Sequence, residues 1–85
     1  MHQLEKLGFN LKHPLLVIKA KNGFLACGYI NPDACNKTEE ACAIVTGVST
    51  YDDMYQSSVV AVSNKALELG VEVGESGESA LNKMS

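Results

Sequence analysis

Arginine and tryptophan are absent from the sequence, and all seven basic residues are lysines. Arginine provides the planar, two-point hydrogen bonds with which many nucleic-acid interfaces bind phosphates and base edges. The net charge is −3, and residues 33–85 carry nine acidic side chains against three lysines. Because this acidic region repels phosphate, we expect no nucleic-acid partner.

Long apolar runs are also absent. The runs at residues 15–18, 41–45 and 59–62 are far shorter than the roughly 20 residues that a membrane-spanning helix needs. The N-terminus lacks the apolar segment of a signal peptide. The sequence therefore predicts a cytoplasmic protein without a membrane partner.

Cysteine is sparse, and its three positions follow no common pattern. Cys27, Cys35 and Cys42 cannot all pair within one molecule, and no two of them form a C-x-x-C pair. We therefore expect reduced thiols. The spacings match no common zinc site, even with His13 as a fourth ligand, so we expect no metal and no cofactor.

What is present is the composition of a small globular domain, with 85 residues of which 46% are hydrophobic. A domain of this size buries only about 60–65% of the surface of its unfolded chain, so association with other copies would enlarge a thin core. We predict one domain over residues 1–85. It divides into a poorly defined start (1–10), a sheet region with one short helix (11–48) and a helical part (49–85).

The apolar stretch 23–31 is the segment around which the predicted sheet is organised. Residues 15–20 form a strand, and Asn22-Gly23 is typical of a two-residue type I′ turn, in which both central residues have positive φ. Residues 24–30 are then the antiparallel return strand. Gly28 within it indicates a bulge or a close approach of another backbone.

Two further strands, at residues 9–11 and 43–48, complete a mainly antiparallel sheet of three to four strands. A long helix over residues 59–69 is expected to cover one face, which gives an α+β fold. Residues 15–18 are apolar on both sides of their strand, so both faces need cover. We therefore expect the other face to lie in a homo-oligomer interface.

Helix-start signals precede four segments. Each combines a side chain that can accept a hydrogen bond from the first turn with residues that favour that turn. The predicted caps are Asn31, Thr50, Ser57 or Ser58, and Ser76 or Gly77. The corresponding helices end near residues 37–39, at Tyr55, at Leu69 before Gly70, and at Met84.

Several of these pieces, in this order, resemble one protein family. They are the run 23–31 with Cys27-Gly28-Tyr29 at its centre, Thr46-Gly47-Val48, Thr50-Tyr51-Asp52-Asp53, Leu69-Gly70-Val71 and the run 74–81. From Pro14 to Met84 the chain resembles the YunC-like family, domain of unknown function 1805. The resemblance implies a small α+β domain of bacteria and archaea with no characterised activity, whose N-terminal β region mediates tetramerisation. We therefore expect the homo-oligomer to be a dimer or tetramer formed through that region. It supplies no catalytic residues.

Cys27 is the residue with the most chemical potential, and it has two interpretations. Free cysteine is among the most buried residue types, which favours a small core side chain. A nucleophilic thiol would need a base, and His2 and His13 are the only imidazoles. We therefore expect a structural or binding module of unknown activity. The alternative is a small enzyme with a thiol-dependent or subunit-interface site around Cys27, Asn31 and Thr50.

Other polar groups have simpler explanations. Asp52 and Asp53 stand at a helix start, where capping and the helix dipole account for both. The glycine-bearing helix entries at 46–50 and 74–77 could bind an anion, but they lack the lysine of a P-loop and lie beside acidic side chains. We interpret them as capping turns. The sequence identifies no small-molecule ligand.

Overall fold

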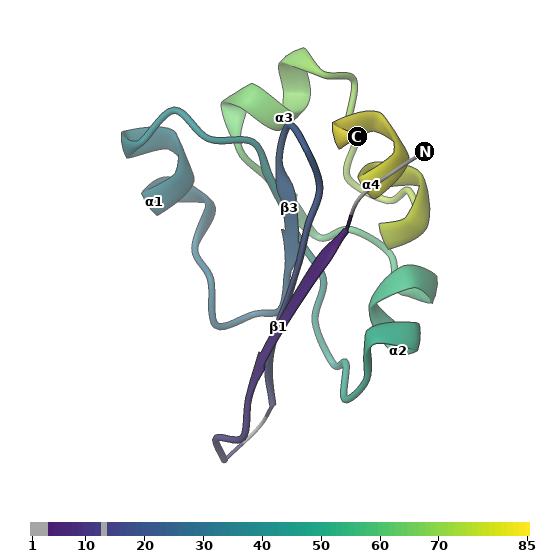
Figure 1. The fold of residues 1–85 in the computed structure, drawn as a ribbon. Coiled ribbons are helices and arrows are strands. Elements are labelled where there is room, and N and C mark those ends of the chain that lie inside the picture. The colour runs from purple at the N-terminus through teal and green to yellow at the C-terminus, as the bar shows by residue number, and fades with distance from the viewer. Residues whose placement is uncertain (1–3, 13) are drawn as a thin grey trace.

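A five-stranded sheet with helices against both faces forms the fold of the computed structural model, which describes residues 4–12 and 14–85 (Figure 1). The strands are β1 (Glu5–Phe9), β2 (Leu15–Lys19), β3 (Phe24–Ala26), β4 (Cys42–Ile44) and β5 (Ala61–Val62). The helices are α1 (Pro32–Lys37), α2 (Tyr51–Gln56), α3 (Asn64–Glu68) and α4 (Gly77–Met84). The predicted α+β class is confirmed, with five strands where three or four were expected.

The strand order is the chain order, β1-β2-β3-β4-β5. The pairings are antiparallel except for β3 with β4, which is parallel and is made by the crossover through α1. The return strand is antiparallel to β2, as predicted, with Ile18 opposite Leu25. Directly paired residues share one face of a sheet, so the register assigns every strand residue to a face.

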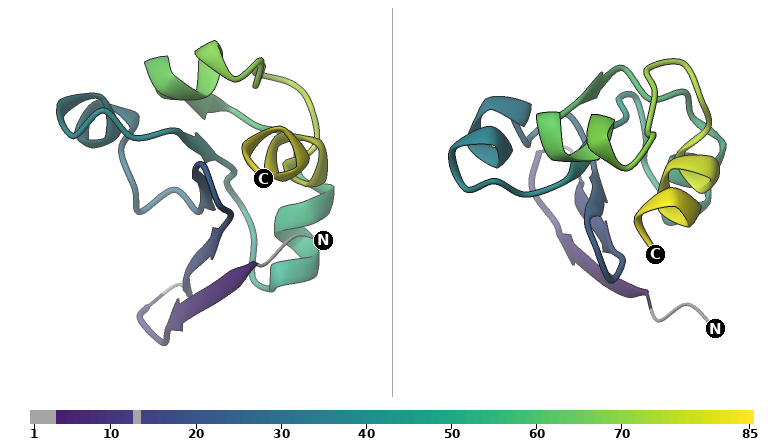
Figure 2. Two further views of the ribbon diagram at one scale, coloured as in Figure 1. Left: turned by 45° about the horizontal axis from the view of Figure 1, so that its top comes forward. Right: turned by 90° about the horizontal axis from the view of Figure 1, so that it is seen from above.

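The inner face of the sheet carries Gly8, Leu16, Ile18, Leu25 and Ala43. Helices α2 and α4 pack against it, and Figure 2 shows both on the same side of the sheet. Their buried side chains complete the main core and are Met54 from α2 with Ala80, Leu81 and Met84 from α4.

The outer face carries Leu7, Val17, Phe24, Ala26 and Ile44. Helix α1 covers only the β4 end of this face (Figure 2). A second, smaller core lies beneath it, formed by buried Ala26, Cys35, Cys42 and Ile44.

A disulfide joins Cys35 of α1 to Cys42 of β4, with 6.4 Å between the two Cα atoms. The prediction of three reduced thiols is therefore wrong for this pair. The crossover places α1 directly on β4, and sequence spacing alone does not reveal that contact.

All four predicted strands end earlier than predicted, and β1 and β4 also begin earlier, whereas β2 and β3 begin where predicted. β1 occupies Glu5–Phe9 in place of residues 9–11, so part of the region expected to be poorly defined is a regular strand. β3 ends at Ala26, and Gly28 lies in a turn where the Ile30 N–H donates to the Cys27 carbonyl at 3.1 Å. β4 likewise stops at Ile44.

The turn between β2 and β3 is not of type I′, because neither Asn22 nor Gly23 has positive φ. Glycine is needed at position 23 for another reason. A Cβ there would lie 2.8 Å from the Ala41 carbonyl oxygen and 2.6 Å from the Met84 sulfur. The turn is fastened to the C-terminal helix, because the Asn22 N–H donates to the Met84 carbonyl at 2.7 Å.

The predicted long helix over residues 59–69 is wrong. Residues 59–63 are extended and include β5, and the helix α3 begins only at Asn64. Its cap is the buried Ser63, whose hydroxyl accepts from the Cys42 N–H and donates to the Glu40 carbonyl, each at 2.8 Å. Valine-rich sequence fits a strand better than a helix, and this tertiary hydrogen bonding fixes the boundary.

The other caps are confirmed. The side chains of Asn31, Thr50 and Ser76 each accept a hydrogen bond from the first turn of α1, α2 and α4, respectively. Gly70 has a φ of 90° and follows α3, as expected for a left-handed helix cap.

Candidate functional site

A groove of about 560 Å³ opens beside Cys27, between the end of β3 and the loop that leads to α2. Its lining residues are Pro14, Cys27, Gly28, Tyr29, Thr46, Gly47, Val48 and Ser49. The groove therefore brings together the Cys27-Gly28-Tyr29 segment and the Thr46-Gly47-Val48 segment, two of the motifs that carry the family resemblance.

Cys27 belongs to the inner core and is only 4% exposed. Its sulfur accepts a hydrogen bond from the Leu16 N–H at 3.4 Å. This position agrees with the interpretation of Cys27 as a small core side chain. The two imidazoles considered as its base, His2 and His13, lie outside the described residues.

Asn31 and Thr50, the other two candidates, do not line the groove. The Asn31 side-chain oxygen accepts from the Asp33 N–H at 2.8 Å, and the Thr50 hydroxyl accepts from the Asp53 N–H at 3.1 Å. Each is thus engaged in starting a helix. The structure does not bring the three candidates together around one cavity.

The three cysteines also separate. Cys35 and Cys42 lie under α1 on the outer face, whereas Cys27 is part of the core on the inner face. Within residues 4–12 and 14–85, His, Cys, Asp and Glu side chains form no cluster suited to a metal ion.

The acidic side chains at the starts of α2 and α4 make hydrogen bonds that cap or support these helices. An Asp53 carboxylate oxygen accepts from the Ser49 N–H at 3.0 Å, in addition to the Thr50 contact. Before the start of α4, Glu75 accepts hydrogen bonds from the Ser79 hydroxyl and the Glu72 N–H. It also forms an ion pair with Lys83 at 3.1 Å.

Partial burial acts to raise the pKa of Glu75. The hydrogen bonds from Ser79, Glu72 and Lys83, together with the Lys83 charge, outweigh it and hold the pKa of this carboxyl below its ordinary value. Lys83 also donates to the Gly70 carbonyl at 2.8 Å. Glu75 is therefore an ionised structural link between the loop after α3 and helix α4.

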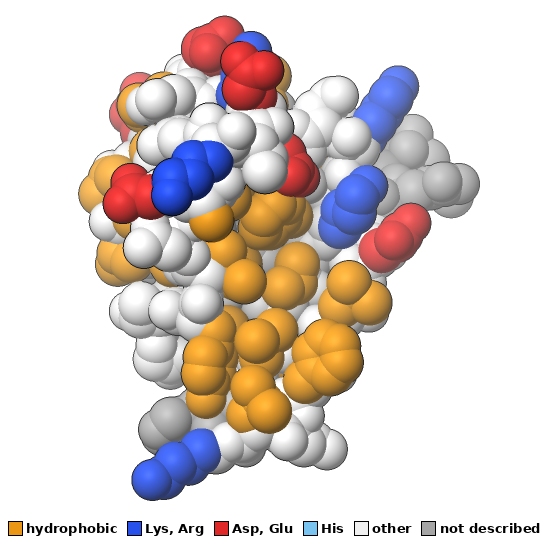
Figure 3. Space-filling view, turned by 90° about the vertical axis from the view of Figure 1, so that its left-hand side faces the viewer, with side chains coloured by type: hydrophobic (Ala, Val, Ile, Leu, Met, Phe, Trp, Pro, Cys, Tyr) orange, Lys and Arg blue, Asp and Glu red, His pale blue; other side chains and the backbone are white. Residues whose placement is uncertain are grey.

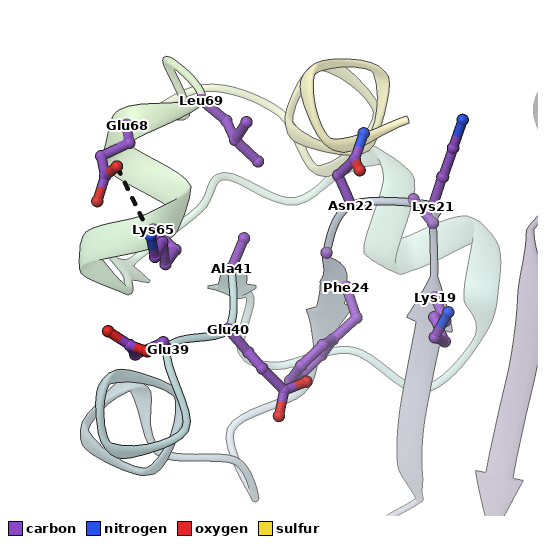
Figure 4. Close-up of a pocket in the computed structure, with 12 residues that line it drawn as sticks. Lys19, Lys21, Asn22, Phe24, Glu39, Glu40, Ala41, Lys65, Glu68 and Leu69 are labelled. Carbon is purple, nitrogen blue, oxygen red and sulfur yellow. Dashed lines mark ion pairs between the residues drawn. The ribbon is translucent and has the colours of Figure 1, made fainter.

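A second groove, of about 480 Å³, lies between the β2–β3 turn and α3 (Figure 4). Lys19 and Lys21 stand on the strand side, and Glu39 and Glu40 stand on the side of α1, which gives the groove oppositely charged rims. These four side chains are exposed, and Lys65 at the far end already pairs with Glu68 at 3.9 Å. Exposed charges of both signs are the ordinary features of a soluble surface, so this groove is not assigned a ligand.

The outer face between α1 and β1 holds an apolar area without helical cover. We define the outer-face patch as Leu7, Phe9, Val17, Phe24 and Ile30. Leu7 is 52% exposed and Phe9 60%, and the other three are partly buried. Figure 3 shows apolar side chains gathered on this face, with charged side chains around the margin. The sequence pattern predicts an apolar face here but does not reveal Leu7, because β1 begins at Glu5, four residues before the predicted strand.

The model of the family described as "Domain of unknown function (DUF1805)" matches residues 26–84. The chain belongs to this family. The resemblance proposed from the sequence is therefore confirmed, although the matched region begins at Ala26, within β3, so that β1 and β2 lie before it.

Among solved structures, the chain is similar to a protein of unknown function, TA1206 from Thermoplasma acidophilum. The two share 29% sequence identity with a TM-score of 0.85, over 100% of this chain and 94% of the other. The likeness thus includes the N-terminal strands that the family match omits. No curated protein matches the chain. Among the described residues, no helix has the length and apolar character needed to span a membrane.

Proposed function

We propose that this member of the family is a homo-oligomeric structural or binding module whose copies associate through the outer-face patch. The observation that carries the proposal is the exposure of Leu7 and Phe9 on a regular strand. Both project from the same face of β1, beside Val17 of β2. Alternating exposed apolar residues on one strand produce a flat surface, which suits a second copy better than a small ligand.

The position of β1 supports the same proposal. β1 is an edge strand of the described sheet, so one side of its backbone lacks a strand partner there. Proteins usually shorten such an edge, cover it or place charges along it. Here all five residues of β1 are exposed, and Leu7 and Phe9 would contribute about 1.5–3 kcal/mol each on full burial.

The oligomeric state tests the proposal. Sedimentation velocity and native mass spectrometry of the full chain at micromolar concentration should give a dimer or tetramer. Leu7→Glu should weaken association at least tenfold, because it places a carboxylate in the apolar contact on every copy. Circular dichroism should show an unchanged fold, since Leu7 is half exposed.

Leu67→Glu provides the matched control. Leu67 is the same residue type with 54% exposure, but it lies on α3, away from β1. This variant should associate like the unmodified chain. A monomeric mass for the unmodified protein, or equal weakening by both substitutions, would exclude the outer-face patch as the site of association.

A thiol-dependent site in the groove beside Cys27 is the second candidate, favoured by the position of a free thiol in the wall of a cavity. A reactive thiol must be accessible and ionised near neutral pH. Rapid labelling of native protein by iodoacetamide at Cys27, lost in Cys27→Ala, would support an enzyme. A thiol that reacts only after denaturation would contradict it and leave Cys27 as a core residue.

A further inference from the structure

We propose that the Cys35–Cys42 disulfide is a redox-sensitive latch that holds α1 over the outer face, and that its reduction extends the outer-face patch towards β4. The consequence for association rests on the function proposed above. The latch itself rests on the contacts of α1.

Helix α1 depends on the disulfide for its position. It has six residues, and Cys35 is the buried residue among them. A helix this short is unstable in isolation, so contacts with the sheet must maintain it. The covalent bond to Cys42 connects the buried side of α1 directly to β4, the fourth strand of the sheet.

Apart from the disulfide, few interactions among the described residues connect α1 to other elements. The Asn36 side-chain oxygen accepts from the Asn64 N–H at 2.8 Å, at an exposed position. The Glu40 N–H donates to the Cys35 carbonyl at 2.8 Å, which closes the end of the helix on itself and adds no link to the sheet. Loss of the disulfide would therefore leave α1 held by one surface hydrogen bond and by the packing of the Cys35 thiol and of the partly buried Pro32 and Asn36.

The surface beneath α1 is apolar and continuous with the outer-face patch. Ala26 and Ile44 are 0% and 3% exposed under the helix. Val17, Phe24 and Ile30 pack against the same cluster from the uncovered side. Opening of α1 would thus enlarge one apolar surface without creating a separate one.

The exchange chemistry requires a dithiol reductant, either a small molecule or a protein. One thiolate of the reductant attacks a disulfide sulfur, forms a mixed disulfide and releases one cysteine as thiolate, which takes up a proton. The second thiolate then attacks the mixed disulfide, so that the reductant leaves as a disulfide and two electrons have passed to the protein. Both protein sulfurs are buried, so attack requires α1 to move first. Cys27 lies on the inner face and is not positioned to exchange with this pair.

Hydrogen exchange of the full chain with and without dithiothreitol tests the latch. Intact-mass analysis after alkylation should give one free thiol before reduction and three afterwards, under denaturing conditions. Amides of residues 32–40 should exchange at least tenfold faster after reduction, while those of β2 should change little. Cys35→Ala should exchange fast in both conditions, and Cys27→Ala should respond to dithiothreitol like the unmodified chain.

Two results would overturn the latch: three free thiols in air-oxidised protein, or unchanged exchange of residues 32–40 after complete reduction. Sedimentation of the same samples separates this inference from the proposed association. If α1 opens on reduction but the protein is monomeric in both states, the latch is supported and the proposed association fails. If an oligomer forms while α1 stays protected, association stands and the latch fails.

Discussion

The two faces of the sheet are covered unequally, although both are apolar. On the inner face, α2 and α4 pack so closely that Ile18 and Leu25 are fully buried. On the outer face, the single short helix α1 covers the β4 end, and Phe9 at the other end remains 60% exposed. The inner face has the packing that stabilises a fold, whereas the outer face has unburied apolar surface available for contact.

The difference indicates how a chain of 85 residues divides its apolar side chains. Three helices contribute buried side chains to one core, and covering the second face equally well would need more chain. We infer that stability resides mainly on the inner face and association on the outer face. Substitutions on the two faces should then differ in kind: those on the inner face should lower the free energy of unfolding, and those on the outer face should change assembly.

The largest effect is expected for Leu25→Ala. Leu25 is fully buried at the centre of the inner face, and removing its side chain should leave a cavity between β3 and α4. The free energy of unfolding should fall by about 3 kcal/mol, within the range for buried leucines. Urea denaturation followed by circular dichroism measures the change.

Leu7→Ala is the substitution on the outer face that corresponds to Leu25→Ala on the inner face. Because Leu7 is 52% exposed in the single chain, truncation should cost less than about 1 kcal/mol in dilute protein, where association contributes least. Equal losses for Leu7→Ala and Leu25→Ala would refute the proposed division between the faces.

An effect smaller than that of Leu25→Ala is expected for Gly77→Ala, which tests how tightly the inner-face helices approach one another. A Cβ at position 77 would collide with the Met54 carbonyl oxygen and lie 2.8 Å from a Leu25 methyl group. Displacing the start of α4 should cost about 2 kcal/mol, as overpacking of a core does.

Gly28→Ala is the control for this prediction. In this variant the new Cβ would meet only a Thr46 methyl group at 3.4 Å, so thermal unfolding should be nearly unchanged. A lower melting temperature for Gly28→Ala than for Gly77→Ala would contradict the close approach.

Local signals in the sequence were sufficient to predict much of the fold. Asn31 before Pro32 predicts α1, and Ser76 before Gly77 predicts α4, because a cap and the residues that follow it act within one turn. The aliphatic run at 15–20 likewise predicts β2. The family was also recognisable from the order of short motifs, as the match over residues 26–84 confirms.

What failed depends on contacts between distant segments. Residues 59–69 offer an apolar stripe at helical spacing, yet Ser63 bonds to Cys42 and Glu40 and divides the segment into a strand and a short helix. The disulfide partner of Cys35 was missed because it depends on where the crossover places α1. The groove beside Cys27 unites two motifs far apart in the chain, and no pattern in the sequence indicates that they meet.

A smaller effect than that of Gly77→Ala is expected for Glu75→Gln, which tests how the inner-face helix α4 is held in place. The Glu75 carboxylate is 14% exposed and holds Ser79 and Lys83 of α4 together with the Glu72 backbone. Because the folded-state pKa is lowered, ionised Glu75 stabilises the fold above the unfolded-state pKa, and this contribution is lost as pH falls through the folded-state pKa. The substitution should cost about 1–2 kcal/mol at pH 7.

The difference in unfolding free energy between the original chain and Glu75→Gln should therefore shrink as the solution is acidified from pH 7 to below about pH 4. Glu78→Gln is the matched control, because Glu78 is an exposed carboxylate in the first turn of the same helix. Its unfolding free energy should change by only a few tenths of a kcal/mol. A constant difference for Glu75→Gln across this pH range would show that the carboxylate charge of Glu75 does not hold α4 in place on the inner face.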